Sequence, residues 1–100
     1  MQLPLVWRMM AEYLAMPEPL AGQWWRALEH ARWSAAVSLR QQVQWASTDP
    51  GVKFRTPSPQ ELVQVTYNLV SEARLSPQSA HTITEAILAR TDKAGQWRAV

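Results

Sequence analysis

The sequence predicts a single all-α domain over residues 1–100, with about four helices arranged around a long central helix. Apolar residues recur at three- and four-residue spacing in four stretches, which is the period of an amphipathic helix. Neither glycine nor proline interrupts the longest stretch between residues 23 and 49. The alternating segment 52–55 would be one isolated strand, which cannot form a sheet, so we expect an ordered loop there.

The composition is that of a folded chain. Hydrophobic residues make up 47% and charged residues 18% of the 100 positions, enough for one small core. Most of the six tryptophans are expected in that core, because each buries a large apolar area. Without cysteine the chain has no disulfide or thiolate chemistry. With neither a signal-peptide pattern nor an apolar run of membrane-spanning length, we expect a soluble, cytoplasmic protein without a membrane partner.

The first helix is expected at 5–16 and the long central helix at 20–47. Pro17 and Pro19 separate the two, and Pro19 suits the first turn of the second. At about 1.5 Å per residue the second helix would be roughly 40 Å long, so it either overhangs the domain or bends near Ser34 or Ser38. The first helix is expected to turn the following residues inward: Val6, Met9, Met10, Tyr13 and Leu14.

Two serine–proline pairs predict the starts of the remaining helices. Ser58 can cap a helix that begins at Pro59, and Glu61 completes a capping box. The segment 76–78 repeats the cap and proline for the last helix, and the tail 93–100 is expected as a frayed end or a short turn. The expected centre of the core consists of Trp24, Leu28, Leu39, Leu62, Val65, Leu69, Ile83 and Ile87.

Residues capable of catalysis are sparse. His30 and His81 lie on different expected helices, and neither has paired carboxylates nearby. Metal-ligand spacing and a glycine-rich phosphate loop are both missing from the sequence. We therefore expect a non-enzymatic protein with no catalytic residues, no cofactor and no metal.

One face of the expected long helix combines polar residues with two apolar ones, Trp33 and Val37. Tryptophan beside arginine is typical of interface hot spots. This predicts an adaptor or inhibitor that binds another protein or a second copy of itself. A partner would desolvate Trp33 and Val37 while Arg26 and Arg40 pair with its carboxylates. Alternatively, the first helix or the tail covers this face. The predicted partner-binding residues are Arg26, His30, Trp33, Val37, Arg40 and Gln44.

Residues 69–83, with the sequence LVSEARLSPQSAHTI, support a second hypothesis. This segment resembles the helix-turn-helix of many bacterial regulators, which implies a DNA-binding protein whose last helix enters the major groove. It departs from that pattern at Arg74, where the turn usually has glycine, and few basic residues flank the helix, so nucleic acid is the less favoured partner. A simple helical hairpin explains the same segment. The resemblance assigns DNA binding to Arg74, Gln78, His81, Thr82 and Arg90, with Glu85 on the same face.

Overall fold

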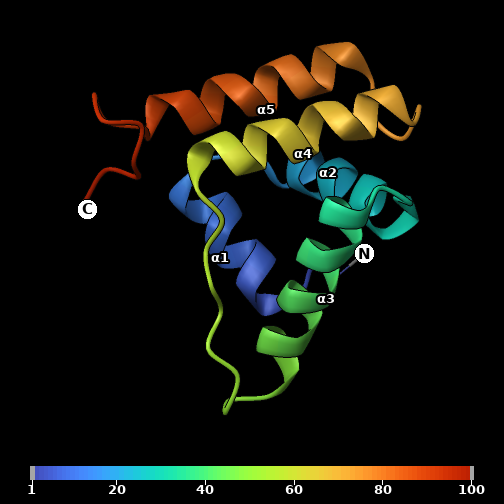
Figure 1. Cartoon of the computed structure of the whole chain (residues 1–100), viewed down its shortest axis with the longest axis vertical. Helices are drawn as coiled ribbons and strands as arrows, with labels where there is room; N and C mark the ends of the chain where they lie inside the picture. The colour runs from blue at the N-terminus through green and yellow to red at the C-terminus, as the bar shows by residue number, and fades with distance from the viewer. Residues whose placement is uncertain (1, 100) are drawn as a thin grey trace.

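Five α-helices make up the protein, whose computed structural model describes residues 2–99 (Figure 1). Within these residues there is no β-strand, and the radius of gyration of 12.7 Å is that of a compact chain of this length. The all-α class is therefore confirmed. The helices are α1 (Leu5–Tyr13), α2 (Glu18–His30), α3 (Ser34–Thr48), α4 (Pro59–Ser71) and α5 (Pro77–Ala89).

The predicted central segment is helical but not one continuous helix, because the chain bends between α2 and α3; of the two alternatives, overhang or bend near Ser34 or Ser38, the structure shows a bend just before Ser34. Ala31 and Trp33 have extended backbone angles, with ψ of 145° and 131°. The break precedes Ser34, which is instead the first residue of α3. A carboxylate 40 residues away compensates for the interrupted helix: Glu72 accepts the backbone N–H groups of Arg32 and Trp33 at 2.7 and 3.0 Å. Both backbone N–H groups at the bend are therefore hydrogen-bonded although the helix is interrupted.

Arg40 satisfies the other side of the same bend. Its Nη1 atom donates to the carbonyl oxygens of Leu28 and Glu29 at 3.1 and 2.7 Å, and reaches that of Ala31 at 3.5 Å. These carbonyls belong to the last turn of α2, where helices leave acceptors without intrahelical donors. The interrupted backbone is therefore held by one anionic and one cationic side chain, a pairing that local sequence could not indicate.

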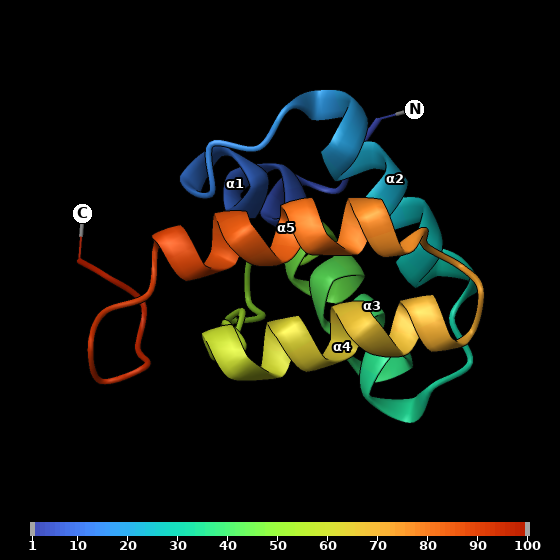
Figure 2. The same cartoon turned by 90° about the horizontal axis from the view of Figure 1, so that it is seen from above.

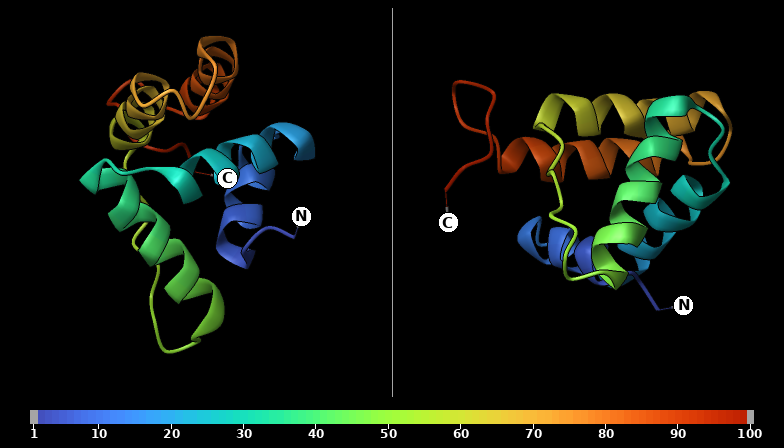
Figure 3. Two further views of the ribbon diagram at one scale, coloured as in Figure 1. Left: turned by 90° about the vertical axis from the view of Figure 1, so that its right-hand side faces the viewer. Right: turned by 60° about the horizontal axis from the view of Figure 1, so that its bottom comes forward.

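The helices pack in two groups. α4 and α5 lie side by side and antiparallel in both Figure 1 and Figure 2. α2 crosses beneath this hairpin, and α1 and α3 extend away from it on the far side of α2 (Figure 3). The connection 49–58 runs in an extended path from the end of α3 back to the start of α4 (Figure 1).

A tryptophan cluster fills the junction of α1 and α2. The ring centroid of Trp7 lies 4.4 Å from that of Trp24 and 5.4 Å from that of Trp25, with tilted planes. The indole N–H of Trp7 donates to the carbonyl of Ala21 at 3.3 Å. The eight residues expected at the centre of the core are all buried: Trp24, Leu28, Leu39, Leu62, Val65, Leu69, Ile83 and Ile87.

The inward side of α1 differs from the expectation. Trp7 is fully buried, whereas Met9, which the periodicity places inside, is 59% exposed. Because this helix carries apolar residues around most of its circumference, periodicity alone does not select the buried side. The tryptophan takes the core position, since it buries more area than methionine.

The predicted caps of α4 and α5 are present. Ser58 and Glu61 form the reciprocal capping box, with both hydrogen bonds at 3.1 Å. The hydrogen bond from the backbone N–H of Ser58, supported by the Ser58 hydroxyl and by nearby Arg55, lowers the pKa of the Glu61 carboxyl. At α5, the hydroxyl oxygen of Ser76 accepts the N–H of Ser79 at 3.1 Å. Both caps could be predicted from the sequence because each involves residues within one helical turn.

The tail folds back onto the body. Thr91 and Trp97 form an antiparallel bridge, and the indole N–H of Trp97 donates to the carbonyl of Pro57 at 2.7 Å. The hydroxyl of Tyr13 donates to the carbonyl of Arg98 at 2.6 Å. The tail is thus a bridged turn anchored on α1 rather than a frayed end; Val100 lies outside the described residues.

A left-handed residue ends α4. The sequence suggested Arg74 as the turn position that usually takes glycine, but it is Ala73 that has a positive φ, of 59°. The N–H of Arg74 then donates to the carbonyl of Leu69 at 2.9 Å, which is the Schellman arrangement. An L-residue pays an energetic cost in this conformation that glycine does not.

We therefore expect Ala73→Gly to raise the free energy of unfolding by about 0.5–1 kcal/mol, since the relief of strain exceeds the added flexibility of the unfolded chain. Urea denaturation followed by circular dichroism measures the change. Ala15, after the end of α1, also has a positive φ, of 53°. Ala15→Gly should therefore also raise the urea concentration at the midpoint of unfolding. A lower midpoint for both variants would contradict this explanation.

Candidate partner-binding surface

Trp33 lies half exposed at the bend between α2 and α3, with 50% of its surface open to solvent. It borders a groove of about 470 Å³ between α3 and α4, which we call the Trp33 groove. Neither α1 nor the tail covers it, so the alternative of a folded-over face is not what the structure shows. The groove is lined by Trp33, Ala35, Ser38, Leu39, Gln42, Arg55, Pro57, Glu61, Gln64, Val65 and Asn68.

The groove has an apolar floor and a polar rim. Leu39 and Val65 are buried beneath it and belong to the core. The rim carries three side-chain amides, each able to donate and accept hydrogen bonds: Gln42, Gln64 and Asn68. Of the two charged residues in the lining, Glu61 is already bonded in the capping box, which leaves Arg55 as the cation facing the groove. An apolar centre with a polar rim is the usual composition of a protein interface.

The bend fixes the position of the exposed indole. The backbone N–H of Trp33 is bonded to Glu72, and its carbonyl accepts the N–H of Val37 at 2.9 Å at the start of α3. Arg40 holds the preceding helix end at the same corner. The tryptophan is therefore presented from a backbone with bonded neighbours on both sides rather than from a free loop.

The structure separates the six residues predicted for partner binding. Arg26 and His30 lie on α2 and line a different groove, of about 550 Å³, together with Arg74 at the α4–α5 turn. Val37 is half buried one turn after Trp33, and Gln44 borders a surface depression beside Trp45. A continuous helix would have aligned them on one face, and the bend after His30 redirects its two halves.

Arg40, predicted to pair with a partner's carboxylate, makes contacts within the chain that the sequence did not indicate. Its Nη1 atom is occupied by the carbonyls at the end of α2, at 2.7 and 3.1 Å, and the side chain is partly buried. The guanidinium has further N–H groups on Nη2 and Nε, so pairing with a partner's carboxylate stays a prediction. Arg55, which sequence analysis did not single out, is the arginine that lines the Trp33 groove.

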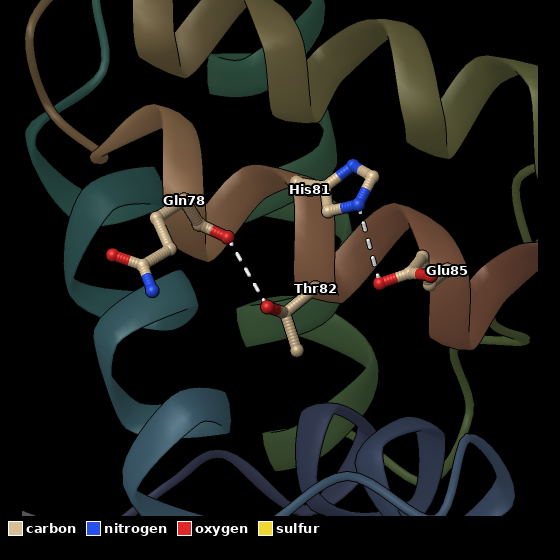
Figure 4. Close-up of polar contacts among 4 residues, drawn as sticks. All are labelled: Gln78, His81, Thr82 and Glu85. Carbon is tan, nitrogen blue, oxygen red and sulfur yellow. Dashed lines mark hydrogen bonds and ion pairs between the residues drawn. The ribbon is translucent and has the colours of Figure 1, made fainter.

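The residues assigned to DNA binding divide into two sets. Gln78, His81, Thr82 and Glu85 share the exposed side of α5 (Figure 4). There, Nε2 of His81 lies 3.3 Å from a carboxylate oxygen of Glu85.

The Thr82 hydroxyl donates to the Gln78 carbonyl at 3.1 Å, within the same helix. The basic residues lie elsewhere. Arg74 is in the α4–α5 turn, and the guanidinium of Arg90 stands 5.4 Å from the ring centroid of Tyr13. Helix-turn-helix pairs cross at about 90–120°, whereas α4 and α5 lie antiparallel; DNA binding stays a prediction.

Two further features of the surface were not found from the sequence. Trp45 is 59% exposed on α3, where it borders the depression beside Gln44. Its position in a glutamine-rich stretch, 41–45, was the available signal for an exposed aromatic residue. The amides of Gln64 and Asn68 come from α4, so only the packing of α4 against α3 could place them beside Trp33.

No family model, curated protein or solved structure matches this chain. Among the described residues 2–99, no group of three or more histidine, aspartate or glutamate side chains is placed to hold a metal ion. Within the same range, every helix is too short or too polar to cross a bilayer. Function must therefore be inferred from the surface of the protein itself.

Proposed function

We propose that this chain is a small non-enzymatic binding protein, of the adaptor or inhibitor kind, that contacts a partner protein with the Trp33 groove. The observation that supports this most is the half-exposed indole of Trp33, held at a hydrogen-bonded bend beside an apolar floor. Tryptophan is among the residues most enriched in interface hot spots, particularly where it sits at the centre of a desolvated patch.

Binding would work by desolvation. A partner's apolar side chain enters between Trp33 and Leu39, while the amides of Gln42 and Gln64 form hydrogen bonds at the rim. Arg55 pairs with an acidic residue of the partner, and that rim contact contributes more to specificity and association rate than to affinity. Because Glu72 and Arg40 already hold the bend, little ordering is required on binding, which favours affinity.

The test compares two exposed tryptophans, Trp33 at the start of α3 and Trp45 near its end. Partner proteins are captured from lysate with the wild type, with Trp33→Ala and with Trp45→Ala, and the dissociation constant of the captured partner is then measured by calorimetry. We expect Trp33→Ala to weaken binding about 10- to 30-fold, a loss of about 1.4–2 kcal/mol, and Trp45→Ala to leave it within about twofold.

Equal binding by the wild type and Trp33→Ala, with both folded by circular dichroism, would contradict the proposal. A change from dimer to monomer on Trp33→Ala in sedimentation would identify the partner as a second copy. The DNA-binding hypothesis is separated by titration with random duplex DNA: a phosphate binder loses affinity steeply as salt rises, whereas a protein adaptor shows no appreciable binding.

A further inference from the structure

The outward side of α1 lines a second groove, of about 400 Å³, which is separate from the Trp33 groove and which we call the α1 groove. Three segments distant in sequence form it: α1, the connection before α4, and the folded-back tail. Its lining is almost entirely apolar and rich in methionine and aromatic rings. The lining residues are Val6, Met9, Met10, Tyr13, Phe54, Thr56 and Trp97.

The apolar surface extends beyond the groove along α1. Leu5 and Met9 are 49% and 59% exposed, and with Tyr13 they form a row at four-residue spacing. Val6 and Met10, also four residues apart, lie beside this row at the base of the groove, where Val6 is partly buried and Met10 is a buried core residue. Rows of this spacing are the ridges that interlock when two helices pack, so the shape of this surface suits a helix better than a compact small molecule.

The aromatic wall of the α1 groove is fixed by the fold. The rings of Tyr13 and Trp97 meet edge to face at 5.8 Å. Hydrogen bonds from the Tyr13 hydroxyl to Arg98 and from the Trp97 indole to Pro57 hold both rings. Methionine on the opposite wall is flexible and polarizable, which allows it to adapt to the side chains of a partner.

In the connection 49–58 and the tail 90–99, which line the groove together with α1, basic residues outnumber acidic ones: Lys53, Arg55, Arg90, Lys93 and Arg98 against Asp49 and Asp92. The guanidinium of Arg90 lies over the Tyr13 ring, 5.4 Å from its centroid. The backbone carbonyl of Arg98 accepts the Tyr13 hydroxyl, while Nη1 of Arg98 donates to the carbonyl of Ala89 at 3.2 Å. Lys53 is exposed next to Phe54. The carboxylate of Asp92, the acidic residue of the tail, accepts the backbone N–H groups of Ala94 and Gln96, both at 2.9 Å, and is outnumbered by three basic residues of the tail, Arg90, Lys93 and Arg98. The other charged residues of α1, Arg8 and Glu12, line a different groove on its far side.

We infer that the α1 groove binds the apolar face of an acidic amphipathic helix from another protein. The exposed row on α1, the base formed by Val6 and Met10, and the wall of Phe54 and Trp97 would receive that helix's apolar side chains. Lys53, Arg90 and Arg98 would face its carboxylates, and this complementarity selects an acidic partner over a basic one. The site does not use Trp33, so it is independent of the proposed function.

Two synthetic peptides test this directly. Both are about 14 residues long, with leucine at i, i+3, i+4 and i+7; one carries glutamate at the other positions and its twin carries lysine. Fluorescence anisotropy of the labelled peptides is measured with the full chain at about 150 mM salt, where charges more than about 8 Å apart are screened. We expect the glutamate peptide to bind at least tenfold more tightly than the lysine twin.

Two matched pairs of variants locate the binding. Met9→Glu should abolish binding of the glutamate peptide, whereas Leu88→Glu, at a residue of α5 with 58% exposure, should leave it within about twofold. Lys53→Glu should weaken binding about three- to tenfold, whereas Arg8→Glu, on the far side of α1, should change it less than twofold. Circular dichroism confirms that each variant remains folded.

Several outcomes would overturn the inference. Equal affinity for the two peptides would show that charge does not select the partner. An equal loss of affinity in Met9→Glu and Leu88→Glu would show that the peptide does not bind at the α1 groove. Sedimentation that shows a wild-type dimer broken by Met9→Glu would make a second copy the occupant. Retained binding by Met9→Glu, which places a charge in the apolar row, would exclude the α1 groove.

Discussion

Replacement of Trp7 by alanine is expected to lower the free energy of unfolding by about 3–5 kcal/mol, the usual cost of removing a buried aromatic side chain. Trp7 is fully buried, contacts the rings of Trp24 and Trp25, and donates a hydrogen bond to Ala21. Such a loss is a large part of the 5–15 kcal/mol of typical domains. Guanidinium denaturation followed by circular dichroism measures it. The control is Trp45→Ala, which removes an exposed ring and should cost less than about 0.5 kcal/mol.

A finer comparison within the cluster uses phenylalanine. Trp7→Phe and Trp24→Phe remove the same atoms from neighbouring buried rings. Trp7→Phe also loses a hydrogen bond, whereas the indole N–H of Trp24 finds no acceptor among residues 2–99. An unbonded buried N–H costs about 1–3 kcal/mol, so Trp24→Phe should be the milder change by about 1 kcal/mol or more. The reverse order would show that ring packing, rather than hydrogen bonding, distinguishes the two positions.

Features set by neighbouring residues were predictable from the sequence. The starts of α4 and α5 follow from Ser58-Pro59 and Ser76-Pro77, because cap and proline act within one turn of the helix. The central core positions followed from apolar periodicity for the same reason. Trp33 was predicted to be exposed, and it is, although on a bend rather than on a helix.

Features set by distant residues were not predictable. A bend near Ser34 or Ser38 was one of two alternatives, but neither glycine nor proline marks its position at 31–33, since Glu72, just after α4, and Arg40 of α3 stabilise it. For the same reason the arginine beside Trp33 is Arg55, brought there by the connection before α4, and not Arg40. On α1, apolar residues on several sides left the choice between Trp7 and Met9 to tertiary packing.

Two surfaces of different chemistry follow from this fold. The Trp33 groove has amides and one arginine around an apolar floor, while the α1 groove has methionine and aromatic walls among positive charges. We propose one partner for each groove; a chain that bound both at once would act as an adaptor. Trp33→Ala and Met9→Glu should therefore have separable effects on binding, since they share no contact and act on different grooves.

Replacement of Arg40 by alanine is expected to cost about 2–3 kcal/mol, because hydrogen bonds from a charged donor to partly buried carbonyls are among the stronger ones. The carbonyls of Leu28 and Glu29 would lose their side-chain donor at the end of α2. Arg40→Lys should recover only part of the loss, since an ammonium lacks the planar fork of the guanidinium. Arg32→Ala, at an exposed position of the same bend, should cost less than about 0.5 kcal/mol.

The same Arg40 variants test how the bend supports binding. When the end of α2 is released, Trp33 loses part of the backbone support that presents it, so partner affinity should fall even though Arg40 does not line the groove. Urea denaturation and calorimetry with the captured partner measure the two effects separately. If Arg40→Ala left both stability and affinity unchanged while Arg32→Ala reduced either, the bend would not depend on the guanidinium. If Arg40→Ala reduced stability alone, presentation of Trp33 would rest on Glu72.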